Sequence, residues 1–254
     1  AARWANAFIY ASEGQPYGVI VGKKLNRTEA GEVIYENGLP TFDDKVSVLG
    51  NGNYDFTLGF RNAFSYKNLS MSVLVDMKFG ADVYSMSKMQ SHVNGTSKET
   101  LEGREGWYAS EQARLSANVD AKDWTPTGGY VGKGVKAVTD ADGNVSYVPN
   151  DVYVDPAKYW QALQNSSPEP FICDNSFVKL REVSLSYSCP KKWFVHTPIE
   201  SVTLSAYGRN LLLIYSKVDN IDPESSYNNG NGQGFEYGSL PSRRTFGFGI
   251  NVKF

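Results

Sequence analysis

The sequence has few of the residues that usually carry catalysis or bind metals. It contains two cysteines, Cys173 and Cys189, and two histidines, His92 and His196. It has neither a CxxC pair nor a Cys/His cluster, so a zinc site is not expected, and no G-x-S-x-G motif indicates a nucleophile. We therefore expect no enzyme activity, no metal and no cofactor. Both histidines sit in polar, turn-like contexts and are expected at the surface.

The chain also lacks long apolar runs and net charge. No apolar run approaches the roughly 20 residues of a transmembrane helix. The 25 basic residues balance 27 acidic ones, which gives no argument for nucleic acid as a partner. The first residues, A-A-R-W-A-N-A-F-I-Y, do not resemble a signal peptide. A secreted or outer-membrane chain should have one, so the protein is either cytoplasmic or a fragment whose true start lies upstream.

Aromatic residues in alternating stretches are abundant. The 16 Tyr and 13 Phe residues favour strands and membrane-interface girdles. The last stretch, Ser242 to Phe254, alternates strictly between two faces. The apolar face carries Phe246, Phe248, Ile250, Val252 and Phe254, and the other carries Thr245, Gly247, Gly249, Asn251 and Lys253. Taken alone, this strand fits a half-buried β-sandwich and a membrane-facing sheet equally well.

A long hairpin is expected earlier in the chain. Tyr54–Lys67 and Leu69–Tyr84 alternate around the tight turn Lys67-Asn68, with strands of about 14–16 residues. Ordinary strands have about 5–6 residues, whereas tilted membrane-barrel strands are longer. Three charged residues share its polar face: Arg61, Asp76 and Lys78. Two more long strands are expected, at Phe177–Ser188 and Ser201–Tyr215.

The segment Ser85–Asn175 breaks the alternation over about 90 residues, which is far longer than an ordinary loop. Helices are expected at Thr100–Asn118 and from Asp155-Pro156 to about Gln164, with Asp155 as N-cap. A hairpin turn is expected at Thr139–Val145. Its glycine comes too early for an EF-hand, so an Asp-Gly turn is favoured, and calcium binding at Asp140 and Asp142 is left open.

Loop lengths alternate along the chain. Connections are short at Lys67-Asn68 and between Lys191 and Glu200, and long after Tyr84 and Tyr215. Outer-membrane barrels have short turns at one end and long loops at the other, and a sandwich has no reason to, so a barrel is favoured. We divide the chain into an extracellular loop region or strand end (1–53), a barrel hairpin (54–85), a long extracellular loop subdomain (86–175), and the last three barrel strands with one long extracellular loop (176–254). The first region is expected to hold short strands at Ala7–Tyr10 and Tyr17–Gly22 and a hairpin at Glu29–Pro40.

Several segments carry a family resemblance. The most specific are N-S-F-V-K-L-R-E-V-S-L-S-Y-S (Asn175–Ser188), G-R-N-L (Gly208–Leu211), Asp222-Pro223-Glu224 and Asn231–Phe254, and the hairpin segment Asn62–Asp76 also fits. On these residues the chain resembles the C-terminal end of the SusC/RagA-type TonB-dependent outer-membrane transporters. The resemblance implies an all-β fold, namely the C-terminal strands of a 22-stranded transmembrane β-barrel whose long extracellular loops include one with short helices, in a protein roughly four times as long. The plug and the TonB-contacting segment would lie outside this sequence, and five strands alone cannot close a barrel.

The resemblance also implies a function and partners. TonB would drive import of an oligosaccharide or peptide across the outer membrane of a Gram-negative (diderm) bacterium, together with a SusD-type surface lipoprotein. The loops Ser85–Asn175 and Ser216–Leu240 would face outside, and Phe254 matches the family's terminal aromatic, which looks like a membrane-insertion signal. Four loop aromatics can stack on sugar rings or pack the loop's own core, and packing is the commoner use: Trp107, Tyr108, Trp124 and Tyr130.

Two alternatives stay open: a soluble β-sandwich surface binding or adhesion protein, and a passive porin. Carboxylates such as Asp76 and Glu182 belong to strands far apart in sequence, so their pairing cannot be inferred. Cys173 and Cys189 flank the strand Phe177–Ser188, up to roughly 50 Å apart, so we expect no disulfide between them. The sequence does not distinguish a sugar from a peptide as the transported solute.

Overall fold

The computed structural model describes all residues except 1, 5, 227–229 and 231, and it divides into two compact units. One unit, here called the sheet unit, comprises residues 53–82, 174–225 and 239–254. The other, here called the mixed unit, comprises residues 1–52, 83–173 and 226–238. Across the described residues, none of the helices has both the length and the apolar character needed to cross a membrane.

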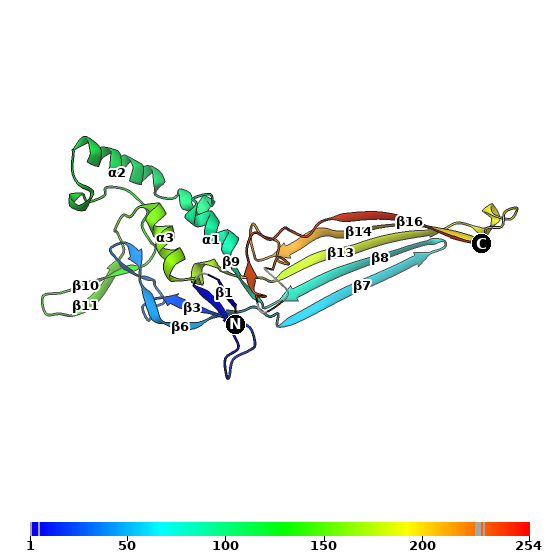
Figure 1. Ribbon diagram of the computed structural model, residues 1–254, viewed down its shortest axis with the longest axis horizontal. Helices are drawn as coiled ribbons and strands as arrows, with labels where there is room; N and C mark the ends of the chain where they lie inside the picture. Colours follow the sequence, from blue (N-terminus) through cyan, green and yellow to red (C-terminus); the bar gives the residue numbers. More distant parts are fainter. Residues whose placement is uncertain (1, 5, 227–229, 231) are drawn as a thin grey trace. The chain divides into compact units, whose positions relative to one another are not determined.

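The sheet unit is one five-stranded antiparallel sheet in the order β16-β14-β13-β8-β7 (Figure 1). Its strands are β7 (Phe56–Tyr66), β8 (Leu69–Phe79), β13 (Phe177–Ser188), β14 (Ser201–Ser216) and β16 (Thr245–Lys253). All five long strands expected from the sequence are therefore confirmed. The hairpin strands are shorter than expected, at 11 residues each, because Gly80 adopts a φ of +88° that ends β8 after Phe79.

The mixed unit contains short sheets. One has the order β1-β2-β3-β6, another β11-β10-β4-β5, and a third β12-β9-β15. Their strands are β1 (Ala2–Trp4), β2 (Ala7–Tyr10), β3 (Val19–Leu25), β4 (Ile34–Glu36), β5 (Leu39–Pro40), β6 (Phe42–Asn51), β9 (Asp82–Ser85), β10 (Val135–Thr139), β11 (Val145–Pro149), β12 (Ile172–Asp174) and β15 (Phe235–Glu236). The short strands near the N-terminus and the two hairpins are confirmed. The ten-residue strand β6 was not expected, because its alternation is weak.

Helices cover the mixed unit's strands. They are α1 (Met86–Val93), α2 (Arg104–Ser116) and α3 (Pro156–Ser166), with short 3-10 turns η1 (Lys98–Leu101), η2 (Ala121–Asp123) and η3 (Glu169–Phe171). Helix α3 begins as expected, with the Asp155 carboxylate accepting a hydrogen bond from the Ala157 N–H at 2.9 Å. Helix α2 starts at Arg104 rather than Thr100, because Gly103 is in the left-handed conformation at φ +80°. Helix α1, capped by the Ser85 hydroxyl, was not expected.

The core of the mixed unit is aromatic. Its buried cluster consists of Ala7, Ile9, Ile20, Tyr35, Tyr84, Met89, Tyr130, Tyr159, Trp160, Leu163, Phe171 and Phe235. These side chains come from β2, β3, β4, β9, α1, α3, η3 and β15 and from the segment between η2 and β10. The strands and helices of this unit therefore share one apolar core.

The expectation for His92 was wrong. Its side chain is 3 % exposed, because α1 places the ring against Trp160 and Phe171, with centroids 4.4 and 5.7 Å away. Both ring nitrogens face acceptors, since Nδ1 lies 2.8 Å from the Lys88 carbonyl oxygen and Nε2 lies 2.6 Å from a Glu99 carboxylate oxygen. This hydrogen bond from His92 lowers the pKa of Glu99. The polar neighbours in sequence concealed a buried, fully hydrogen-bonded histidine. His196 is exposed, as expected.

Candidate functional site

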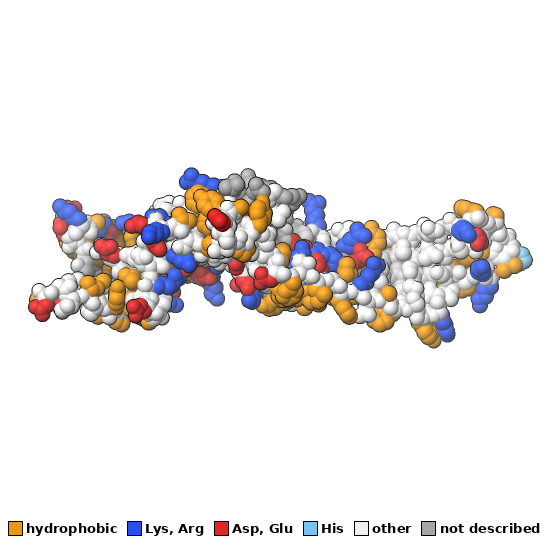
Figure 2. All heavy atoms as spheres, turned by 90° about the horizontal axis from the view of Figure 1, so that it is seen from below, with side chains coloured by type: hydrophobic (Ala, Val, Ile, Leu, Met, Phe, Trp, Pro, Cys, Tyr) orange, Lys and Arg blue, Asp and Glu red, His pale blue; other side chains and the backbone are white. Residues whose placement is uncertain are grey.

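One face of the five-stranded sheet is a continuous apolar surface, here called the outer face. The strand registers align apolar residues across all five strands, as in the rows Tyr66–Leu69–Tyr187–Leu204–Ile250 and Phe64–Met71–Leu185–Ala206–Phe248. Large side chains on this face are exposed: Phe56, Leu58, Phe60, Phe64, Leu185, Phe246, Phe248 and Ile250. Hydrophobic side chains are visible along one side of the sheet unit in Figure 2. Exposed apolar area of this extent indicates a contact with lipid or another protein.

The opposite face, here called the inner face, is polar and changes character along the strands. Near the turn Lys67-Asn68, small side chains hydrogen-bond between neighbouring strands, with Ser65 and Ser70 hydroxyls 3.2 Å apart and those of Ser72 and Ser184 3.1 Å apart. Further along, the row Arg61–Leu74–Glu182–Arg209 carries charges, and Arg209 donates to Glu182 at 2.7 Å. Asp76 therefore lies on a different row from Glu182, and each carboxylate accepts from an arginine.

A β-bulge at Arg181 shapes the charged end of this face. The pairing of β13 with β8 passes from Leu180 to Glu182 and leaves Arg181 as an extra residue. The consecutive side chains of Arg181 and Glu182 thereby share the inner face. On the outer face, the apolar residues of β13 have even numbers before the bulge and odd numbers after it. The bulge was not expected from the sequence, although the adjacent pair Arg181-Glu182 interrupts an otherwise alternating strand and was the available signal. Asn210 on β14, at φ +52°, sits beside it and accepts from Arg181 at 2.7 Å.

The segments that carry the family resemblance meet at this bulge. We call the resulting set of side chains the motif network: Asp76, Asn175, Lys179, Arg181, Asn210, Asp222, Glu224 and Ser242. Lys179, only 4 % exposed, donates to Glu224 at 2.7 Å and to the Ser242 hydroxyl at 2.8 Å, and it lies 3.3 Å from Asp222. The motif network thus joins five segments that are separate in sequence.

Arg181 is the second cation of the motif network. Its two terminal nitrogens donate to the Glu224 carboxylate at 2.8 and 2.5 Å, and one of them also donates to Asp76 at 2.6 Å. Asn175 donates to the Pro223 carbonyl at 2.8 Å, which fixes the backbone of Asp222-Pro223-Glu224. The motif therefore holds the loop after β14 against the inner face, because both of its carboxylates pair with cations of β13.

Burial and pairing act in opposite directions on these loop carboxylates. Burial alone would raise the pKa of Glu224, but hydrogen bonds from Arg181 and Lys179 outweigh it and lower the pKa. Burial likewise opposes ionisation of Asp222, and hydrogen bonds from Ser242 and the Glu224 backbone N–H together with Lys179 leave its pKa lowered. Both groups are therefore held as ionised carboxylates, which suits ion pairs that hold the loop in place and not a role as proton donors.

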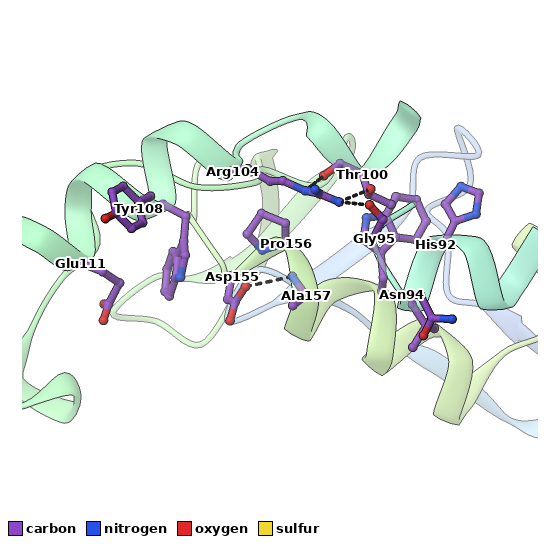
Figure 3. Close-up of a pocket in the computed structure, with 13 residues that line it drawn as sticks. His92, Asn94, Gly95, Thr100, Arg104, Tyr108, Glu111, Asp155, Pro156 and Ala157 are labelled. Atoms are coloured by element: carbon purple, nitrogen blue, oxygen red, sulfur yellow. Dashed lines mark hydrogen bonds between the residues drawn. The ribbon is translucent and has the colours of Figure 1, made fainter. Parts of the chain in front are cut away.

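A cavity of about 530 Å³ lies in the mixed unit (Figure 3). It is lined by α1's end, the start of α2 and the start of α3, which contribute His92, Asn94, Thr100, Arg104, Trp107, Tyr108, Glu111, Asp155 and Trp160 among others. Arg104 is fixed in its wall, because it donates to the Thr100 carbonyl at 2.7 Å and to the Gly95 carbonyl at 2.5 Å. Aromatic rings beside carboxylates can stack on a flat ring and accept hydrogen bonds from hydroxyl or amine groups.

The four aromatic residues expected either to pack the loop's core or to stack on sugar rings are found in different places. Tyr130 is buried in the core, and Trp124 is half-buried with its indole N–H donating to the Ser110 hydroxyl at 3.0 Å. Trp107 and Tyr108 both line the cavity, and Tyr108 is 68 % exposed. Packing therefore accounts for Tyr130, and the cavity brings only Trp107 and Tyr108 together.

The remaining expected sites are placed as follows. The Asp140 carboxylate accepts from the backbone N–H groups of Asp142 and Asn144 at 2.9 and 2.8 Å, which is the hydrogen bonding of an Asx turn. The described part of the chain brings no three His, Cys, Asp or Glu residues together as a metal site.

Phe254 follows β16 with 80 % of its side chain exposed, and its role as an insertion signal stays a prediction. Cys173 and Cys189 flank β13, so the strand assignment behind their expected separation is confirmed.

Comparison with known proteins supports the resemblance inferred from the motifs. No family model matches the chain. Two curated proteins of Formosa agariphila do: TonB-dependent receptor P3, 27 % identical over 85 % of this chain, and TonB-dependent receptor P26, 29 % identical over 92 %. The chain spans 18 % and 20 % of their lengths, about a fifth.

Solved structures give the fold. The RagAB peptide transporter superposes on 98 % of this chain with a TM-score of 0.54 and 16 % identity, and this chain covers 25 % of the solved one. The RagAB peptide importer in its closed-closed state gives the same TM-score at 14 % identity. The resemblance of this chain to SusC/RagA-type TonB-dependent receptors is confirmed, and its all-β fold is that of RagAB over the matched quarter.

Proposed function

Because this chain is similar over most of its length to two TonB-dependent receptors, we propose that it forms part of the barrel wall and external loops of a TonB-dependent importer. The importer lies in the outer membrane of a Gram-negative bacterium and works with a SusD-type surface lipoprotein. This chain is its C-terminal part, with the other strands, the plug and the TonB-contacting segment elsewhere in the full protein. The solute is an oligosaccharide or a peptide.

The observation that carries the proposal is the exposed outer face. Strand β7 has 11 residues from Phe56 to Tyr66, which corresponds to about 34 Å along the strand. At the usual barrel tilt of about 40–45° this length covers about 25 Å, which is the height of the apolar band of an outer-membrane barrel. In water, the same face would expose large apolar side chains over five strands, a strong liability for aggregation.

The inner face fits a polar lumen. Serines and glycines near the turns leave room for water, whereas the row with Arg61, Glu182 and Arg209 presents charges. The motif network holds the loop after β14 over this face, so we assign Asp222-Pro223-Glu224 the role of fixing an external loop to the wall.

The mixed unit is the part we assign to the outside, where solute and lipoprotein arrive. Its cavity, with Trp107 and Tyr108, is the candidate contact for solute. RagAB, whose fold is similar, is a peptide transporter, and an oligosaccharide fits aromatic rings beside carboxylates equally well. Peptide and sugar therefore both remain candidates for this protein.

The test places single spin labels on the intact protein that contains this chain, reconstituted in lipid. Leu185 on the outer face and Ser186 on the inner face are adjacent on β13 and form a matched pair. We expect a label at L185C to be reached by oxygen dissolved in the lipid and not by a polar nickel chelate. A label at S186C should show the reverse preference.

The alternatives make different predictions for the same pair. A soluble β-sandwich would leave both labels with low accessibility to lipid-dissolved oxygen, and this outcome would overturn the membrane assignment. A passive porin would keep the label pattern but would take up solute equally well in cells that lack TonB. Loss of uptake in such cells is the result expected here.

A further inference from the structure

The two ends of the sheet unit differ in whether their basic side chains form ion pairs. The turn end consists of the turn Lys67-Asn68, the connection from Pro190 to Ile199 that contains the 3-10 turn η4 (Lys191–Trp193), and the last residues Lys253 and Phe254. The opposite end, where the motif network lies, is the loop end. At the loop end the buried Lys179 and the half-buried Arg181 share three carboxylates.

Three lysines of the turn end have no such partner. Lys67, Lys191 and Lys192 are exposed, and none of them forms an ion pair with any residue that the structure describes. Glu200, which follows the connection from Pro190 to Ile199, lies 2.6 Å from Lys253, so these two charges balance each other. Three positive charges are thus left at one end of a sheet whose chain carries a net charge of −2.

Apolar and aromatic side chains lie among these lysines. Trp193, Val195 and Phe254 are 59, 70 and 80 % exposed. Tyr66 ends the outer face of β7, with the Lys67 ammonium 5.2 Å from its ring centroid. Basic and hydrophobic side chains occur side by side at the end of the sheet unit in Figure 2. Aromatic rings beside lysines are typical of the boundary between lipid headgroups and acyl chains.

The backbone at Lys67 supports a role for its side chain. Lys67 has a φ of +53°, in the left-handed region that two-residue hairpin turns usually fill with Gly, Asn or Asp. A residue with a Cβ costs about 1 kcal/mol or more in this conformation. A lysine at a position where glycine would be less strained supports the hypothesis that its side chain has a role.

We propose that the turn end of the sheet binds the headgroups of anionic phospholipids in the membrane leaflet that surrounds it. Lys67, Lys191 and Lys192 contact the phosphates, and Trp193 lies at the boundary with the acyl chains. The inference rests on the proposed function, because only a membrane-embedded sheet brings a leaflet to this end. Short turns face the periplasm in such barrels, so the leaflet concerned is the inner one.

The experiment uses the intact transporter in detergent micelles and the fluorescence of Trp193, taken as the difference between the native protein and W193F. Brominated phosphatidylglycerol and brominated phosphatidylcholine are compared as quenchers. A lysine near a lipid surface favours anionic lipid by roughly fivefold, so we expect at least a tenfold preference for phosphatidylglycerol at low salt. High salt should reduce this preference, because it screens exposed charges.

The decisive variant is K67Q/K191Q/K192Q, which should bring the preference close to one. The matched control is K122Q/K133Q/K158Q, which removes the same charge from exposed lysines of the mixed unit and should keep the native preference. Equal quenching of native protein by both lipids would overturn the inference. Retention of the preference in the triple variant, or displacement of the lipid by an equal concentration of inorganic phosphate, would do the same.

Failure of this inference can be separated from failure of the proposed function. If the L185C label is not reached by lipid-dissolved oxygen, the membrane assignment itself is wrong. If that label is lipid-exposed and the lipid preference is absent, the sheet spans the membrane and only the headgroup site is wrong.

Discussion

The mixed unit and the sheet unit use the same aromatic-rich composition in opposite ways. In the mixed unit, Tyr84, Phe171 and Trp160 are buried in a common core. In the sheet unit the largest apolar side chains, such as Phe248 and Phe64, point outward and remain exposed, while a lysine is buried. The difference supports the proposal that the two units lie in different surroundings, the mixed unit in water and the sheet unit with an apolar medium on one side.

The contrast extends to charge. Charged side chains of the mixed unit stand mainly at its surface, for example Lys136 with Asp151 at 2.5 Å. In the sheet unit the strongest ion pairs lie on the inner face and are partly or fully buried. The mixed unit therefore places its charges on its surface and the sheet unit on its inner face, which under the proposed function faces a lumen.

The largest expected effect comes from a charge on the outer face. Val183 lies in the middle row, beside Val73, so Val183→Lys should lower the free energy of unfolding by about 4 kcal/mol, the upper end of the cost of a lysine at the bilayer midplane. Ser184→Lys, on the inner face of the same strand, should cost less than about 1 kcal/mol. Urea unfolding of the intact protein in vesicles measures both. Similar losses for the two variants would contradict the assignment of the faces.

A second comparison tests the core of the mixed unit. Tyr130 is 9 % exposed and its ring lies 4.4 Å from that of Tyr159, so Tyr130→Ala should destabilise this unit by roughly 3 kcal/mol. Tyr108→Ala removes an exposed ring from the cavity and should cost less than about 0.5 kcal/mol. Hydrogen exchange of α2 and α3 reports the difference. If Tyr108→Ala were equally damaging, its ring would be part of the core and not of a solute contact.

The motif network offers a third test. Glu224→Gln removes the carboxylate shared by Lys179 and Arg181. We expect the free energy of unfolding to fall by roughly 2 kcal/mol. This is less than the full cost of breaking a buried pair, because Glu224 is one-fifth exposed. Glu182→Gln breaks only the pair with the exposed Arg209 and should cost about 0.5 kcal/mol. Equal effects would show that the bulge does not desolvate its ion pairs.

Acidification should act on the same network. The pKa values of Asp222 and Glu224 are lowered in the folded protein, so their contribution to stability is complete above the pKa of the unfolded carboxyls, about 4. It is lost as the pH falls through the lower, folded pKa values. The temperature at which the native protein unfolds should fall as the pH drops over this range. The unfolding temperature of Glu224→Gln should depend less on pH.

The smallest effect concerns a buried carboxylate of the mixed unit. Glu236, 2 % exposed, accepts from the Ser85 and Ser87 hydroxyls at 2.7 and 2.6 Å, at the N-terminus of α1. Glu236→Gln removes the charge that favours this helix end and should cost about 1 kcal/mol, seen as faster hydrogen exchange in α1. Glu105→Gln, at the exposed start of α2, is the control and should have little effect. Unchanged exchange in α1 would show that Ser85 alone caps the helix.

Much of the sheet unit could be predicted because its information is local. Alternation assigned Phe56, Leu58 and Phe60 to one face, and the pair Lys67-Asn68 marked the turn. The N-cap Asp155 and Pro156 likewise marked the start of α3. Helix α1 was missed because its sequence, M-S-K-M-Q-S-H-V, is mainly polar and short, and its stability comes from Met89 and His92 packing in the core.

By itself, the sequence determined the strands, their two faces and the short turns, since side-chain direction in a strand depends only on a period of two. It also carried the motifs of the resemblance, but not the reason for their presence. Tertiary structure alone decided the burial of His92, the bulge at Arg181 and the convergence of Lys179, Glu224 and Ser242 in one network. These features depend on contacts between residues far apart in sequence, 63 positions for Lys179 and Ser242 and 105 for Arg181 and Asp76, which no local pattern encodes.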